Sequence, residues 1–160
     1  MKKTLLSIAT LALLLSGCVQ TQPTASSKVA TSSYTIDKIK PSADEDAEGA
    51  IDKDFFVKEI LTKKPSNVTI IDVRTDFEYN AGHFEGAKRI PVADIYAKGG
   101  CEKVIAQLPK EGYVVAVCAT GARAGEMWAG LKDTCKYPVA NKVYYLDNNV
   151  MYNPKGGTVK

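Results

Sequence analysis

The sequence predicts an α/β protein in which helices cover both faces of a central parallel sheet. Short, continuous apolar segments alternate along the chain with segments whose apolar residues recur at helical spacing. A strand that is apolar on both sides must be buried on both faces, and helices provide the cover in such sheets. The length of 160 residues, with 45% hydrophobic and 24% charged residues, corresponds to about one soluble domain.

The N-terminal segment is typical of a secretory signal. Lys2 and Lys3 are basic, and the residues from Leu5 to Leu15 are almost all apolar. This run is too short to cross a bilayer, and the polar residues that follow offer no partner for a buried helix. We therefore expect residues 1–17 to be a signal peptide, whose removal lowers the formal net charge from +3 to +1.

A flexible tether is expected over residues 18–50, between this signal and the domain. Residues 20–50 are rich in Ser, Thr, Ala and Gln and include the acidic run Asp44–Asp46. Such a composition cannot bury enough apolar surface to order itself. The domain is then expected over residues 51–160.

The first half of the domain is predicted to form two helices and two strands. Asp52 can cap a helix that Pro65 ends, because the apolar residues between them fall on one side. A short apolar strand is expected over Val68–Val73. A short helix over Glu78–Phe84 and a short strand over Ala87–Val92 follow.

The second half continues the alternation. A helix is expected before Pro109, and Tyr113–Val117 is the strand that looks most buried. The last strand is expected over Val143–Leu146. Between these strands, an amphipathic helix is predicted by apolar residues at i, i+3, i+4 and i+7, namely Ala124, Met127, Trp128 and Leu131.

One cysteine lies where parallel sheets bind ligands, beyond the carboxyl end of a strand. Cys118 directly follows the Tyr113–Val117 strand. Small residues in the loop after it allow backbone N–H groups and the next helix N-terminus to approach the sulfur, which favours the nucleophilic thiolate. Taken alone, such a cysteine is more often a small buried hydrophobe. The loop residues are Ala119, Thr120, Gly121, Ala122 and Arg123.

Three segments together resemble the rhodanese-like domain family. They are Ile70–Arg74, then Glu78–Ala87 followed by Ile90–Pro91, and finally Cys118–Arg123. The combination is specific in this order and spacing, and the likeness covers about residues 50–153. The resemblance implies a three-layer fold with a central parallel sheet and helices on both faces.

The resemblance also implies sulfur transfer through an enzyme persulfide. Cys118 would carry the sulfur, and residues 119–123 would surround it and bind the substrate. Thiosulfate, a polysulfide or another sulfane donor would give one sulfur, and cyanide or a thiol would remove it; no cofactor is implied. Fold relatives that act as phosphatases have five residues between cysteine and arginine, whereas four separate Cys118 from Arg123. A phosphatase is therefore disfavoured.

The sequence departs from the family pattern at two places. Asn148–Asn149 and Tyr152 stand where the family often has a Gly-Gly pair and a tryptophan. Arg123 is the one cation of the loop, which weakens the case for dianionic thiosulfate and favours polysulfides or persulfides as donors. Arg123 could orient an anionic donor or tie down the loop.

Other polar residues of the motifs are expected to support the structure. Asp72, Arg74 and Glu78 could shape the site, but a structural ion pair near a strand end is the expected role. His83, the one histidine of the chain, is expected to support a turn. A preformed thiolate needs no general base.

Cys101 and Cys135 suggest a disulfide if the protein lies outside the cytoplasm. The predicted topology argues against it, because it places Cys101 at the carboxyl end of the sheet and Cys135 at the opposite end. A three-turn helix spans about 16 Å, whereas a disulfide needs Cα atoms within about 7 Å. Cys101 is expected nearer Cys118, which raises the hypothesis of a resolving cysteine that captures or releases sulfur from Cys118. Spare thiols, or pairing through an irregular loop, are the alternatives.

The segment Leu15–Cys18 resembles the bacterial lipobox. The resemblance implies a lipidated Cys18 that anchors the domain to the membrane, outside the cytoplasm in the cell envelope. Val19, in place of an aspartate, would favour the outer membrane in a Gram-negative cell.

The sequence thus predicts an enzyme, a monomeric rhodanese-type sulfurtransferase acting on small sulfur-containing anions and thiol acceptors. A non-enzymatic sulfur carrier or binding module, or a thiol-redox protein using Cys118 with Cys101, are the alternatives. Nucleic-acid binding is not expected, because no basic stripe interleaved with aromatics occurs. Metal-ligand spacings and nucleotide-binding glycine patterns are also missing from the sequence.

Overall fold

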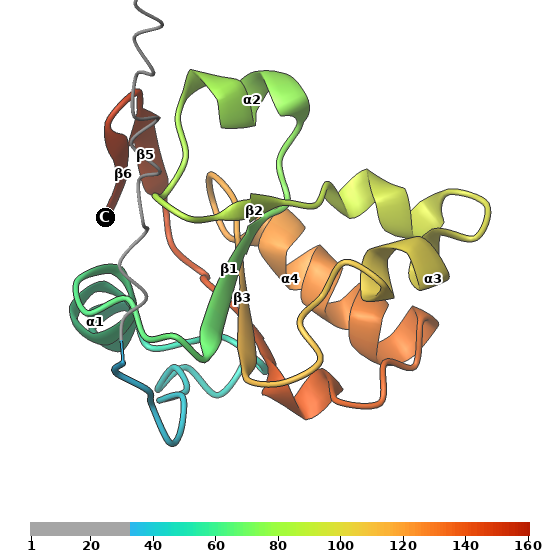
Figure 1. The fold of residues 1–160 in the computed structure, drawn as a ribbon, viewed down its shortest axis with the longest axis horizontal. Coiled ribbons are helices and arrows are strands. Elements are labelled where there is room, and N and C mark those ends of the chain that lie inside the picture. Colours follow the sequence, from blue (N-terminus) through green and yellow to red (C-terminus); the bar gives the residue numbers. More distant parts are fainter. Residues whose placement is uncertain (1–32) are drawn as a thin grey trace, which may run out of the picture. The chain divides into compact units, whose positions relative to one another are not determined.

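The computed structural model describes residues 33–160 (Figure 1). The predicted signal peptide, Cys18 and the first part of the predicted tether lie outside the described residues. Within the described part of the chain, no helix is long and apolar enough to cross a membrane.

A four-stranded sheet in the order β2-β1-β3-β4 forms the centre of the fold. The central strands β1 and β3 pair from Val68 opposite Tyr113 to Asp72 opposite Val117, and every pairing in this sheet is parallel. The prediction of a parallel α/β sheet is confirmed. The strands are β1 (Val68–Asp72), β2 (Lys88–Arg89), β3 (Tyr113–Val117) and β4 (Val143–Tyr145).

Alternation along β3 divides the apolar core between the two faces of the sheet. Val114 and Ala116 belong to one buried cluster, whereas Val115 and Val117 belong to the other. Successive side chains of a strand point to opposite faces, so a fully apolar strand requires cover on both. Figure 1 shows this cover, with α3 and α4 on one side and α1 on the other.

The four predicted helices occur in the expected order with shifted bounds, and two short 3-10 segments, η2 (Val92–Tyr96) and η4 (Ala140–Lys142), were not predicted. The other helical segments are α1 (Lys53–Phe55), η1 (Phe56–Leu61), α2 (Asp76–Ala81), α3 (Gly100–Ile105), α4 (Ala122–Ala129) and η3 (Gly130–Thr134). Helix α2 begins earlier than predicted because Thr75 caps it: the Thr75 hydroxyl accepts from the Glu78 N–H, and the Glu78 carboxylate accepts from the Thr75 N–H. An antiparallel hairpin that was not predicted, β5 (Val150–Asn153) and β6 (Gly156–Val159), ends the chain.

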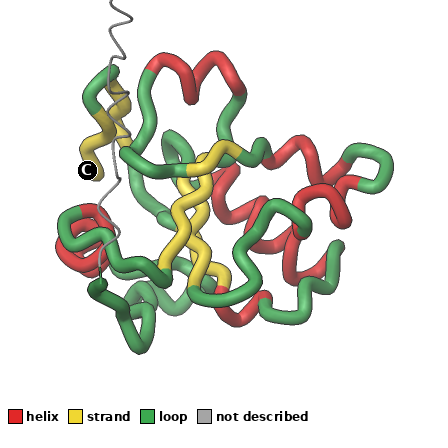
Figure 2. Tube along the Cα trace, viewed as in Figure 1, coloured by secondary structure: helices red, strands yellow, loops and turns green. Residues whose placement is uncertain are grey.

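The prediction that the tether reaches residue 50 is wrong for its described end. Residues 33–51, here called the strap, run as a loop against the domain (Figure 2). Ile39 is 0% exposed and Ile36 is 7% exposed, and both pack in the cluster on the α1 side of the sheet. The average composition of about thirty residues does not reveal that a few isoleucines are placed to pack into the core. The burial of these side chains fixes the strap against the domain.

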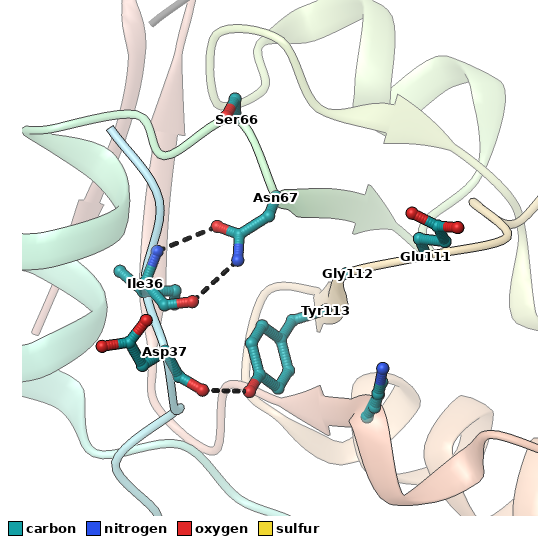
Figure 3. A pocket seen from close by; sticks show the side chains of 8 residues that line it. Ile36, Asp37, Ser66, Asn67, Glu111, Gly112 and Tyr113 are labelled. Atoms are coloured by element: carbon teal, nitrogen blue, oxygen red, sulfur yellow. Dashed lines mark hydrogen bonds between the residues drawn. The ribbon is translucent and has the colours of Figure 1, made fainter. Parts of the chain in front are cut away.

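Polar contacts fasten the strap at the amino ends of β1 and β3. The Asn67 side chain accepts from the Ile36 N–H at 3.0 Å and donates to the Ile36 carbonyl at 2.7 Å (Figure 3). The Tyr113 hydroxyl donates to the Asp37 carbonyl at 2.6 Å. Further along, the Ile51 N–H donates to the Tyr145 carbonyl at 2.9 Å, so the strap also pairs with the outer edge of β4.

Cys101 and Cys135 form a disulfide with Cα atoms 5.2 Å apart, so the prediction that they are too distant is wrong. In the expected topology, the helix that contains Cys101 begins at the carboxyl end of the sheet. Instead, η2 first packs against α4. At the start of η3, Ile95 lies so close to Gly130 that a Cβ added there would meet the Ile95 side chain at 2.9 Å. Cys101 therefore starts α3 beside the end of η3, and it is not a free resolving thiol for Cys118.

Candidate active site

Cys118 lies at the carboxyl end of β3, between β1 and β4 in the middle of the sheet. Its side chain is 1% exposed and belongs to the apolar cluster beneath α4. Among the described residues it is the free cysteine, because the other two form the disulfide. Residues 119–123, here called the cysteine loop, directly follow Cys118, and α4 begins within this segment at Ala122.

The first two carbonyls of the loop point toward β5. The Cys118 carbonyl accepts from the Tyr152 hydroxyl at 3.2 Å, and the Ala119 carbonyl accepts from the Val150 N–H at 2.8 Å. In a trans peptide the N–H points opposite to the preceding carbonyl, and no described peptide bond is cis. The N–H groups of Ala119 and Thr120 therefore face away from β5.

Gly121 makes the tight turn of the loop possible. It precedes α4 with a φ of 90°, a conformation that residues with side chains rarely adopt. An added Cβ would lie 2.3 Å from Asp147 Oδ1 and 2.8 Å from the Asp147 Cα. Glycine is thus required both by the backbone angle and by the close approach of the segment after β4.

Arg123 forms a two-point ion pair with Glu78, which links α4 to α2. Its Nη1 donates to Glu78 Oε2 at 2.8 Å and its Nη2 donates to Oε1 at 2.7 Å. Each side chain is about one-third exposed. The hydrogen bonds from Arg123, followed by those from Thr75, lower the pKa of Glu78 to about 2. Of the two roles expected for Arg123, this contact corresponds to tying down the loop.

Asp72 and Arg74 form a buried ion pair behind the loop. Arg74 Nη2 lies 2.6 Å from Asp72 Oδ2 and also donates to the Gly82 carbonyl at 2.7 Å. The Arg74 guanidinium covers the Tyr152 ring, with its Cζ 3.4 Å from the ring centroid. Because Tyr152 in turn donates to the Cys118 carbonyl, this pair supports the loop through β5.

Burial raises the pKa of Tyr152, and the negative charge of Asp72 raises it further. The hydroxyl therefore keeps its proton and acts as a donor to the Cys118 carbonyl. The contact of Tyr152 with the Cys118 carbonyl was not predicted from the sequence. The sequence named Glu78 but did not identify it as the partner of Arg123.

His83 lies in the turn that ends α2. Its Nδ1 is 2.9 Å from the Tyr79 carbonyl, and its ring stacks on the Tyr79 ring at 3.8 Å. A carbonyl only accepts, so Nδ1 carries the proton in this contact. The position agrees with the predicted structural role.

An open hollow occurs at the other end of the sheet (Figure 3). Asn67, Tyr113 and Lys142 are among its lining residues, and they lie at or near the amino ends of β1, β3 and β4. Cys118 is at the carboxyl end of β3. The Asn67 side-chain amide is already hydrogen-bonded to the Ile36 backbone of the strap. This hollow therefore lies where the strap attaches to the sheet, and it is separate from the site at Cys118.

The fold and the loop define a class of parallel α/β domains that place a cysteine between a central strand and a helix. A profile of the rhodanese-like domain matches residues 56–151, which is more than half of the chain. The chain belongs to the rhodanese-like domain family.

Several solved structures are similar to this chain. A protein from Staphylococcus saprophyticus is 25% identical over 61% of this chain and 82% of its own, with a TM-score of 0.44. A rhodanese-related protein from Thermoplasma volcanium is 20% identical over 52% and 72%, with a TM-score of 0.38. The anaerobic ergothioneine biosynthesis enzyme from Chlorobium limicola is 22% identical over 61% of this chain but 24% of its own, with a TM-score of 0.49. The comparison with curated proteins gives no match.

Proposed function

We propose that the protein is a sulfurtransferase that moves sulfane sulfur through a persulfide on Cys118. Membership in the rhodanese-like family, which includes sulfurtransferases, supports this proposal. The observation that carries it is the place of Cys118: a free thiol at the carboxyl end of the central strand, followed by four residues and Arg123.

The reaction is two successive displacements at sulfur. The Cys118 thiolate attacks the outer sulfur of the donor, a new S–S bond forms, and the donor's own S–S bond breaks. The leaving group departs with the electron pair, as sulfite from thiosulfate or as a thiolate from an organic persulfide. Cyanide or a thiol then attacks the outer sulfur of the Cys118 persulfide and restores the Cys118 thiolate.

The chain's own backbone stabilises the charged sulfur in this proposal. The N–H groups of Ala119 and Thr120 face away from β5, and α4 begins soon after them in the loop, at Ala122. Backbone donors and a helix N-terminus favour negative charge. Gly121 keeps the loop close to the segment after β4, which fixes the direction of these donors.

We further propose that the protein acts outside the cytoplasm, held to the membrane by a lipid on Cys18. The lipobox-like segment Leu15–Cys18 supports this location. The disulfide between Cys101 and Cys135 supports it independently, because disulfides persist in oxidising compartments and are rare in the cytosol. The working unit in this proposal is a monomer.

Intact-protein mass spectrometry tests the chemistry. The protein, with its disulfide intact, is exposed briefly to thiosulfate or polysulfide beside a matched Cys118→Ser variant. We expect the wild-type chain alone to gain one sulfur atom and to lose it to cyanide. A chain that gains no sulfur from either donor, or a variant that gains as much, would contradict the proposal.

A sulfur-carrier function is the second candidate. It is favoured by the burial of Cys118, because a thiol that is 1% exposed accepts sulfur only when the loop or a partner uncovers it. Steady-state turnover separates the two functions. Repeated cycles with small donors and acceptors support the enzyme, whereas stoichiometric loading without turnover supports the carrier.

A further inference from the structure

Each guanidinium beside the cysteine loop is matched by a carboxylate. Residues 119–122 carry no charged side chain. Arg74 is bound to Asp72 and is buried with it. Arg123 points both of its terminal nitrogens at the two Glu78 oxygens. The loop therefore adjoins two neutral ion pairs rather than a surplus of positive charge.

This balance matters because sulfane donors differ in charge. Thiosulfate brings two negative charges to a thiolate that already has one, so three charges gather in the loop during attack. A protonated organic persulfide brings none, and a hydrogen polysulfide brings one. Unpaired cations offset such repulsion, but a guanidinium already engaged with a carboxylate offers little net charge.

We propose that Glu78 is a specificity-determining residue that, by pairing with Arg123, makes the site prefer low-charge persulfides and hydrogen polysulfides to dianionic thiosulfate. The inference rests on the proposed sulfurtransferase function. Glu78 acts through Arg123 and is thus a positioning residue rather than a catalytic one.

The surroundings of Glu78 hold it in this role. The Thr75 hydroxyl donates to Glu78 Oε2 at 2.7 Å, and the Thr75 N–H donates to the same oxygen at 3.2 Å. These contacts fix the carboxylate at the start of α2, facing Arg123. The pKa of Glu78, lowered to about 2, keeps it ionised in the pH range of any cell compartment.

The test replaces Glu78 by glutamine, which keeps the size and one acceptor oxygen but removes the negative charge and leaves the Arg123 charge uncompensated. Thiosulfate and N-acetylcysteamine persulfide are compared as donors, with cyanide as the acceptor. We expect the ratio of kcat/KM for thiosulfate to that for the persulfide to rise about tenfold, mainly through a lower KM for thiosulfate. Sulfite, the dianionic product, should also inhibit the Glu78→Gln enzyme more strongly.

Two further variants identify the cause. Asp76→Asn makes the same change in net charge on the same helix, but Asp76 pairs with Arg89 instead of Arg123, so the donor ratio should not move. The double variant Glu78→Gln/Arg123→Gln should return to the wild-type ratio, because the freed cation is gone. If Glu78→Gln does not fold, Arg123→Gln alone should lower the ratio by leaving Glu78 unpaired.

The outcomes separate this inference from the function it rests on. An equal fall in kcat/KM with both donors in Glu78→Gln would show that the ion pair is purely structural, and it would overturn the inference. If the donor ratio rose as much in Asp76→Asn, the effect would come from the net charge of the protein, and the inference would also be overturned. A wild-type enzyme that uses thiosulfate as well as the persulfide overturns the inference and leaves the sulfurtransferase standing. If the wild-type protein transfers sulfur from neither donor, both the inference and the proposed sulfurtransferase function are contradicted.

Discussion

Gly121 combines two demands that can be measured apart. Its φ is 90°, and an added Cβ would meet Asp147 Oδ1 at 2.3 Å; Gly86 has a similar φ of 77° but open space around it. We expect Gly86→Ala to cost about 1 kcal/mol in the free energy of unfolding, from backbone strain alone. Gly121→Ala should cost about 3 kcal/mol or more, because crowding adds to the strain.

Urea unfolding of both glycine variants measures these costs. Sulfur loading of Cys118 should be slowed in Gly121→Ala, since the loop must move away from Asp147 to admit the methyl group. Equal unfolding energies for the two variants would mean that the loop relaxes freely around this position.

The residues of the cysteine loop could be predicted from the sequence because they are contiguous. Cys118 and Arg123 are separated by four residues, and the strand before them and the helix after them have clear patterns. The contacts that hold the loop could not be predicted in this way. Glu78 lies 45 residues from Arg123, and Tyr152 lies 34 residues from Cys118, so no local spacing encodes either contact.

At the scale of elements, the disulfide joins α3 to the end of η3 and closes a loop of 34 residues. The double variant Cys101→Ser/Cys135→Ser should lose about 4 kcal/mol of unfolding free energy, following the entropy of a loop of this length. Persulfide loading of Cys118 should persist, because neither serine lies in the cysteine loop.

Urea unfolding with and without a reductant checks this prediction. The reductant should destabilise the wild-type chain and leave the double variant unchanged. A wild-type chain indifferent to the reductant would show that the crosslink adds nothing to the stability of the fold.

The elements that the sequence predicted well have strong, continuous patterns. The Tyr113–Val117 strand was predicted at its observed bounds because every residue in it is apolar. The β5–β6 hairpin was missed because its strands are short and mostly half-exposed or exposed. Its packing is tertiary: at Gly157 an added Cβ would meet the Phe84 ring at 2.7 Å, a contact that no local pattern reports.

For the whole molecule, the strap moves the start of the folded domain ahead of residue 51. A chain that begins at residue 51 lacks the buried side chains of Ile36 and Ile39. It should be less stable than a chain that begins at residue 33 by about 3–6 kcal/mol, from the loss of two buried isoleucines. Thermal and urea unfolding of the two chains, side by side, measure the difference. Equal stability of the two chains would mean that the folded domain begins at residue 51, as the composition predicted.

The two outer strands of the sheet are protected in different ways. An uncovered strand presents unpaired N–H and C=O groups on which another chain can build. On one side, β2 has two residues, Lys88 and Arg89, both charged. On the other, Gly49 and Ile51 of the strap occupy the N–H and carbonyl of Tyr145. Loss of the strap would therefore open an edge for edge-to-edge aggregation, and the hydrogen bonds that complete this sheet also stop it from growing.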